Sequence, residues 1–156
     1  NGAFSKINIE LGQDFDLSDE IRWENSLQMQ YALGGKNLDG SQDLSIGGIY
    51  GVRYYPDGEE SAENGYILNT ELFYKLPNFK NLISKISVFY DIGRVVASTN
   101  VTGEKARTLQ DVGIGYYGTY NSLFINTHLA KNLSSKMISE DEKSDLKFLV
   151  QAGWVF

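Results

Sequence analysis

The side chains with the clearest chemistry in this sequence are one arginine, Arg53, and one aspartate, Asp91. Arg53 follows an alternating segment and precedes an aromatic pair, in residues 52–56 (VRYYP). A guanidinium is costly to bury alone, so it needs a carboxylate or an aromatic face beside it. Asp91, in residues 89–93 (FYDIG), is the best candidate partner in the chain. The pattern therefore indicates an ion pair between two distant segments.

Residues suited to enzymatic or metal chemistry are sparse. The chain has no Cys and a single His, His128, which excludes thiol nucleophiles, thiolate metal sites and sites built from several His. Asp57, Glu59, Glu60 and Glu63 cluster in the sequence but lack the spacing of a calcium loop. The serines lie in no motif that supplies a general base. We therefore predict no enzymatic activity, no catalytic residues, no metal site and no cofactor.

Length and composition predict one strand-rich domain. The 156 residues suffice for one sizeable core, and 10 Tyr, 8 Phe and 16 Gly against 2 Pro are typical of strands and turns. A formal net charge of -6 without a basic patch argues against nucleic acid as a partner. No apolar run approaches the roughly 18 residues of a membrane helix, but transmembrane strands leave a much weaker trace. The chain begins at Asn1 without Met or a signal peptide, so we expect a mature fragment or an excised piece.

Apolar and polar residues alternate over eight segments, which predicts eight strands. Each segment runs about ten residues, long enough for a tilted membrane crossing. Arg53 continues the polar parity of the third segment, and Asp91 lies on the polar parity of the fifth. The segments are roughly residues 3–12, 21–33, 42–51, 65–76, 85–93, 107–119, 123–132 and 146–156.

The connections between these segments differ in character. Those after the first, third, fifth and seventh segments are mostly longer or charged, and the others are tight or Gly-rich. Short turns at one edge and longer loops at the other are typical of an outer-membrane barrel. The chain also ends inside a strand, at Trp154 and Phe156, which would be an aggregation hazard in a soluble domain. A soluble sandwich or lipocalin-like barrel remains the alternative, because alternation alone does not separate the two.

Two motifs together resemble the barrel of the two-partner secretion transporters, of the TpsB or haemolysin-activator type. These belong to a wider superfamily of outer-membrane assembly factors. One motif lies in residues 43–59 (DLSIGGIYGVRYYPDGE), and the other, in residues 89–95 (FYDIGRV), is similar to the family's Phe-x-Asp-x-Gly strand. The family usually has Gly after the loop Arg, where this chain has Tyr54, and Gly permits backbone dihedrals that Tyr does not. The motif residues are Val52, Arg53, Tyr54, Tyr55 and Pro56 in the loop, and Phe89, Asp91 and Gly93 in the strand.

The resemblance implies an all-β, antiparallel transmembrane β-barrel in the bacterial outer membrane. Residues 1–156 would be the C-terminal half of a sixteen-stranded barrel, with about eight strands and without the periplasmic domains. The whole protein would be a pore that secretes or activates a large exoprotein partner, haemolysin-like or adhesin-like. In the family the loop folds back into the lumen, where its Arg meets the Asp of the strand motif. Here Arg53 and Asp91 would form that lock as a charge-assisted pair.

The resemblance also implies partners besides the exoprotein. These are outer-membrane lipid, lipopolysaccharide, and the barrel-assembly machinery, which would read Trp154 and Phe156 as a C-terminal signal. Two other functions stay open: a small barrel that acts as an adhesin or structural anchor, and an outer-membrane protein assembly factor of the same superfamily. An eight-stranded barrel closed on itself is filled by side chains, which leaves no room for an inserted loop. A membrane-embedded hydrolase is disfavoured because no Ser/His/acid set is recognisable.

Overall fold

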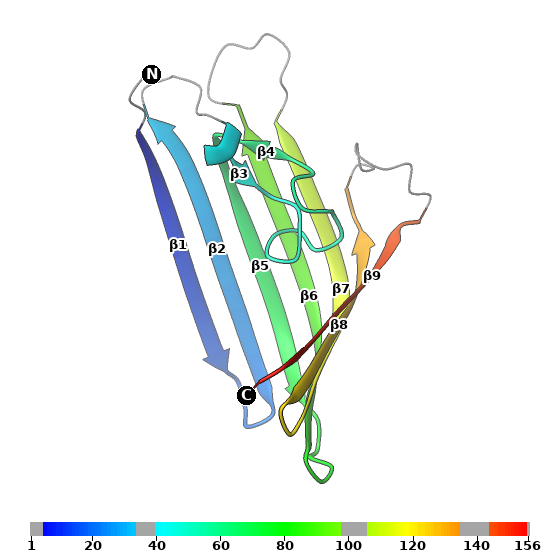
Figure 1. Cartoon of the computed structure of the whole chain (residues 1–156). Coiled ribbons are helices and arrows are strands. Elements are labelled where there is room, and N and C mark those ends of the chain that lie inside the picture. The colour runs from blue at the N-terminus through cyan, green and yellow to red at the C-terminus, as the bar shows by residue number, and fades with distance from the viewer. Residues whose placement is uncertain (1–4, 34–39, 98–105, 135–143, 156) are drawn as a thin grey trace.

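The computed structural model describes residues 5–33, 40–97, 106–134 and 144–155, and most of these residues lie in strands. Seven antiparallel strands form one sheet in the order β1-β2-β5-β6-β7-β8-β9 (Figure 1). The predicted all-β, antiparallel fold class is confirmed. No helix within these ranges is long and apolar enough to cross a membrane. The strands of the sheet are β1 (Ser5–Asp16), β2 (Ile21–Leu33), β5 (Asn64–Lys75), β6 (Leu82–Val96), β7 (Arg107–Tyr120), β8 (Leu123–Asn132) and β9 (Leu146–Trp154).

The third predicted strand, residues 42–51, is wrong. A 3-10 turn, η1 (Gly40–Gln42), leads into β3 (Leu44–Ser45), which pairs only with β4 (Ser61–Ala62), and β2 pairs directly with β5. The glycines explain why the alternation did not produce a strand. Gly48 has a φ of 100°, and the N–H of Gly51 donates to the carbonyl of Gly48, so the chain turns here. The described part of the main sheet therefore has seven strands rather than eight.

Long and short connections alternate strictly once that segment is removed from the sheet. Short turns join β1 to β2, β5 to β6 and β7 to β8 at one end of the strands. The strand ends that the longer connections join all lie at the opposite end, at the top of Figure 1. The connection of residues 17–20, expected among the longer or charged ones, is a short turn. The other two short turns each contain a left-handed residue with φ 52°: Lys80 between β5 and β6, and Asn121 between β7 and β8. This arrangement is typical of an outer-membrane barrel.

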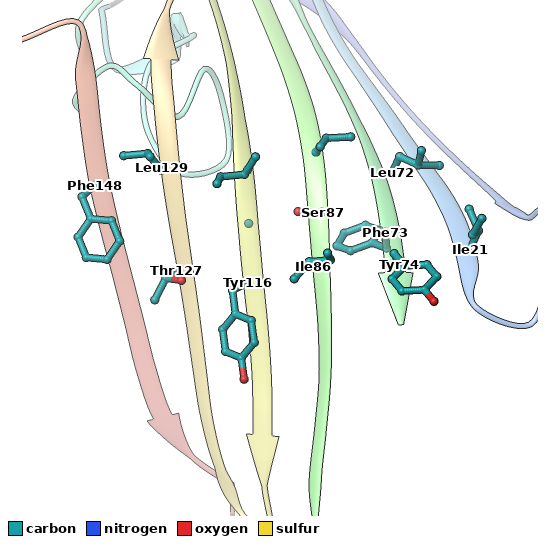
Figure 2. A pocket seen from close by; sticks show the side chains of 13 residues that line it. Ile21, Leu72, Phe73, Tyr74, Ile86, Ser87, Tyr116, Thr127, Leu129 and Phe148 are labelled. Carbon is teal, nitrogen blue, oxygen red and sulfur yellow. The ribbon is translucent and has the colours of Figure 1, made fainter. Parts of the chain in front are cut away.

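One face of the sheet carries large apolar side chains that remain exposed. We call this the outward face. The exposure of its apolar side chains indicates a surface that faces lipid, because a soluble sandwich would bury them. Figure 2 shows the face from β2 to β9, with a hollow of about 630 Å³ among its side chains. The hydroxyls of Tyr74 and Tyr116 both point toward the end of the sheet where the short turns lie (Figure 2). This orientation is expected of amphipathic rings at one membrane interface. The exposed apolar side chains of this outward face include one from each strand of the sheet: Ile9, Trp23, Leu72, Ile86, Ile114, Ile125 and Phe148.

The opposite, inward face is polar over most of its area but carries one apolar patch. The side chains of this patch lie on the polar parity of their strands, yet they are only 2–3% exposed. They pack with buried apolar side chains of residues 46–55 to form the core of this chain. The core therefore lies between the connection and the inward face, rather than between two sheets. The patch consists of Ile67, Phe89, Val95 and Leu109.

Candidate functional site

The segment of residues 46–60, called the docked loop below, connects β3 to β4 and reaches partway along the sheet (Figure 1). Its backbone bonds largely to itself. The N–H of Ile46 donates to the carbonyl of Glu60 at 2.9 Å, and the N–H of Val52 donates to the carbonyl of Ile46 at 2.8 Å. The N–H of Gly48 donates to the carbonyl of Tyr55 at 3.0 Å. These bonds satisfy polar groups that would otherwise be costly to bury against the sheet.

Arg53 lies at the centre of the contact between the docked loop and the strands. Its Nε is 3.2 Å from Asp91 Oδ2, and its Nη2 is 2.6 Å from Glu71 Oε2. Its Cζ lies 4.0 Å from the centroid of the Phe89 ring. All four residues are at most 8% exposed. The guanidinium is thus held by two acids and an aromatic face on neighbouring strands.

The ionisation of Arg53 follows from these contacts. Burial by itself disfavours the charged guanidinium, but the negative charges of Asp91 and Glu71 outweigh burial and raise the pKa of Arg53. Arg53 therefore stays cationic in the docked loop. An arginine that remains charged in a buried position depends on both acids to stay there.

Glu71 is oriented by hydroxyl groups on two other strands. Its Oε1 accepts hydrogen bonds from Ser87 Oγ and from the hydroxyl of Tyr117, each at 2.6 Å. The Tyr117 oxygen also lies 2.8 Å from Nε2 of His128, the single His of the chain. These bonds leave Oε2 of Glu71 directed at Arg53. His128 therefore contributes to the hydrogen-bond network that orients this acid.

Asp91 binds the backbone of the docked loop as well as its side chain. Its Oδ2 accepts a long hydrogen bond from the N–H of Arg53, at 3.4 Å. Its Oδ1 accepts from Asn69 Nδ2 at 2.8 Å, and the same Nδ2 donates to the carbonyl of Gly51, also at 2.8 Å. Asp91 is completely buried. The acid and its asparagine neighbour therefore hold both sides of Val52.

Tyr54 occupies the position where the family usually has Gly. Among the non-glycine residues that the structure describes, only Lys80 and Asn121 have positive φ, so Tyr54 needs no left-handed backbone. Its N–H donates to Asp111 Oδ2 at 2.6 Å, and its hydroxyl donates to the carbonyl of Ser144 at 2.6 Å. Tyr54 thus links the docked loop to β7 and to the segment before β9.

Tyr55 is the largest fully buried side chain of the docked loop, with 1% exposure. Its ring meets the Tyr54 ring edge to face, with centroids 5.1 Å apart. Its hydroxyl donates to Asn132 Oδ1 at 2.7 Å. Burial raises the pKa of Tyr55 to about 12, so the hydroxyl stays protonated in ordinary buffers. Tyr55 therefore anchors the loop through apolar packing and through its neutral hydroxyl, which bonds to Asn132.

Gly93 leaves the space into which the docked loop packs. A Cβ at this position would lie 2.8 Å from Ile46 Cβ and 3.2 Å from Val52 Cγ2. We expect Gly93→Ala to displace the loop, so that trypsin cleaves after the otherwise buried Arg53 about tenfold faster or more in the full-length parent. Gly12→Ala on β1 is the matched control, because nothing lies within 4 Å of its added Cβ. Equal cleavage rates for the two variants would show that Gly93 does not shape this contact.

The structure brings together most residues of the two motifs and leaves a few apart. Pro56 lies at the start of the loop's return, where its carbonyl accepts from the N–H of Glu59 at 3.3 Å. Trp154 is the last residue of β9, 65% exposed and opposite Leu123 on the outward face. Phe156 lies outside the described residues. The residues brought together are Val52, Arg53, Tyr54 and Tyr55 from the docked loop with Phe89, Asp91 and Gly93 from β6.

Several residues of the site were not identified from the sequence. Asn69, Glu71 and Asp111 lie on the polar parity that alternation predicts, but nothing in that pattern separates them from residues that face water. A usable signal was the break in the pattern. Apolar residues on the polar parity of three neighbouring strands, such as Ile67 and Leu109, mark where another segment covers the inward face.

Known proteins are similar to this chain in fold and, to a lower degree, in sequence. The fold is similar to CdiB from Escherichia coli, with a TM-score of 0.78 and 20% identity, covering 96% of this chain and 28% of CdiB. It is also similar to CdiB from Acinetobacter baumannii, with a TM-score of 0.67 and 24% identity, covering 94% of this chain and 25% of that one. Both identities are low, so these likenesses concern the fold alone.

In sequence, the chain is 28% identical over 145 residues to the heme/hemopexin transporter protein HuxB of Haemophilus influenzae (strain 86-028NP). The match covers 89% of this chain and 25% of HuxB, so the chain spans about a quarter of the length of this curated relative. The model of one family matches residues 3–118, which include the docked loop and β6 with its strand motif. The chain belongs to the family described as haemolysin secretion/activation protein ShlB/FhaC/HecB.

Proposed function

We propose that this chain is part of an outer-membrane pore that exports a large partner protein by two-partner secretion. Membership of the ShlB/FhaC/HecB family supports the class of function. The exposed apolar face supports a membrane location. The observation that carries the proposal is the docked loop, which is tied to the inward face by Arg53 between Asp91 and Glu71. A small closed barrel acting as an anchor would have no interior space for such a loop.

In this proposal the docked loop occupies the lumen, where it must hold its place, or shift, for export to proceed. One guanidinium is shared by two buried acids, so loss of either contact leaves a charge poorly compensated. The loop therefore keeps one position as long as both acids hold Arg53. Arg53, Asp91 and Glu71 position the loop and carry out no bond chemistry, and we propose that the protein is not an enzyme and needs no cofactor.

The proposed partner is a secreted exoprotein, either haemolysin-like or adhesin-like. The name of HuxB adds a protein concerned with heme or hemopexin as a further candidate class. Contacts with outer-membrane lipid and lipopolysaccharide, and recognition of Trp154 and Phe156 by the barrel-assembly machinery, stay predictions. The gene neighbouring the full-length parent is the place to look for the exported protein.

Replacing the docked loop in the full-length parent tests the proposal. Ser45 and Ser61 are directly paired, so residues 46–60 can be replaced by Asn-Gly, which closes a two-residue hairpin without disturbing β3 and β4. We expect the variant barrel to assemble in the outer membrane but to lose about nine-tenths or more of partner secretion. Secretion is measured as partner in the medium against partner in the periplasm, and assembly by barrel content of the outer membrane. Normal secretion from a correctly assembled barrel would remove the docked loop from the mechanism.

A further inference from the structure

Two buried acids lie side by side beneath the docked loop. Asp91 on β6 is the direct cross-strand partner of Asp111 on β7, and both are completely buried. Directly opposed residues on one face of a sheet have Cβ atoms about 4.5–5.5 Å apart, so the two carboxyl groups lie within reach of each other. An ionised carboxylate only accepts hydrogen bonds, so two carboxyl groups can bond to each other only when one carries a proton.

The remaining hydrogen bonds indicate which oxygen has room for that proton. Asp91 Oδ1 accepts from Asn69, and Asp91 Oδ2 faces the Nε and N–H of Arg53. Asp111 Oδ2 accepts from the N–H of Tyr54. Asp111 Oδ1 is buried and has no ordinary donor among the residues that the structure describes. A proton on this oxygen, donated to Asp91, would satisfy it.

The charges that face the pair lead to the same assignment. The docked loop contributes one cation, Arg53, and β5 contributes a third acid, Glu71. The neutral hydroxyl of Tyr55 donates to Asn132, the cross-strand partner of Asp111, and His128 on β8 bonds to Tyr117. At the start of β7, at the end of the sheet opposite the short turns, Arg107 pairs with Glu60 at 2.7 Å. Among the described residues, Arg53 is therefore the one cation paired with Asp91 and Glu71, while Asp111 adds a third buried carboxyl group beside Asp91. A bound proton reduces this excess of negative charge.

We propose that Asp111 is a positioning residue that works as a protonated acid, donating from Oδ1 to Asp91 while its Oδ2 accepts from the N–H of Tyr54. The proton lets Asp91 remain the anionic partner of Arg53. Through its other oxygen, Asp111 holds Tyr54 of the docked loop against β7. Loop docking excludes water from the pair, so docking and proton binding favour each other. Raising the pH removes the proton, sets two negative charges side by side and loosens the loop. This inference concerns the docked state, so it can fail or hold independently of the secretion experiment.

Infrared spectroscopy tests the proton directly. In the full-length parent in lipid nanodiscs, the carbonyl stretch of a protonated carboxyl group should be present at neutral pH and be lost in Asp111→Asn. Glu24→Gln is the matched control, because Glu24 is partly exposed and paired with Arg22 at 3.0 Å, so its replacement should leave the band in place. A spectrum in which Asp111→Asn removes no such band would overturn the proposal.

The pH dependence of docking supplies a second measurement. Val52 is completely buried and Tyr50 is 82% exposed, so the maleimide labelling rate of Val52→Cys divided by that of Tyr50→Cys reports undocking at each pH. From about pH 6 to about pH 9, we expect this ratio to rise about tenfold or more in the parent. Adding Asp111→Asn should make the ratio flat, because an amide donates to Asp91 and accepts from Tyr54 at every pH. A flat parent profile would overturn the proposal even if Asp111→Asn failed to assemble.

Discussion

Arg53→Ala is expected to release the docked loop and to produce the largest effect of any single substitution in this chain. It removes the one cation that Asp91 and Glu71 share and leaves two acids buried without it. Breaking a buried pair in this way costs about 3–5 kcal/mol, which corresponds to a shift in the docking equilibrium of roughly 10²-fold to several thousand-fold. The labelling rate of a cysteine at position 52 should rise by that factor. Partner secretion should fall, as it should when the docked loop is replaced.

The control for this prediction is an exposed arginine with several acidic partners. Arg22 lies 2.6 Å from Asp14 and 3.0 Å from Glu24, but its side chain is 46% exposed. Surface ion pairs contribute about 0–1 kcal/mol, so Arg22→Ala should change the labelling rate little. Arg53→Lys should give an intermediate result, because an ammonium group keeps the charge but loses the planar contacts with two acids and a ring. A protected cysteine in Arg53→Ala would show that apolar packing alone holds the loop.

Tyr55→Ala is the second substitution with a large expected effect. The side chain is 1% exposed and packs within the core that the docked loop shares with the inward face. Removing a buried aromatic side chain costs about 3–5 kcal/mol, so labelling at position 52 should rise nearly as much as in Arg53→Ala. The reason differs, since here the loss is apolar contact and a cavity rather than an uncompensated charge.

Tyr55→Phe separates the ring from the hydroxyl. The substitution removes the hydrogen bond to Asn132 Oδ1, which also accepts from the N–H of Ser134 at 2.7 Å and so keeps a donor. We therefore expect a cost of about 1 kcal/mol, a several-fold change in labelling. Tyr50→Ala, at an 82% exposed position of the same loop, should change docking little. Equal effects of Tyr55→Ala and Tyr55→Phe would contradict the role of the ring.

Together these two predictions describe a loop held by two kinds of contact. The ion pair is directional and fixes where Arg53 lies, whereas the apolar core supplies area without fixing orientation. If both substitutions release the loop, neither contact suffices alone. A loop held in this way changes position as a unit, which is the behaviour that a gate in an export pore requires.

The alternation of residue types was enough to predict which face each strand presents. Successive side chains of a strand point to opposite faces. The period of two therefore placed Asp91 on the inward face and Ile86 on the outward face without any knowledge of which strands pair. The same rule failed for residues 42–51, because Leu44, Ile46 and Tyr50 have a strand's spacing while Gly48 permits a turn. Periodicity reports side-chain pattern and says nothing of whether the backbone continues straight.

The sequence by itself therefore determined the fold class, the two faces of the sheet and, through two motifs, the family and the pair Arg53 and Asp91. Only the tertiary structure decided that Glu71 shares the arginine, that Asp111 lies against Asp91, and that the core forms beneath a loop. These contacts depend on which strands are neighbours and in what register. Register is a property of pairing between distant segments, and many polar residues on one parity are equivalent until that pairing selects among them.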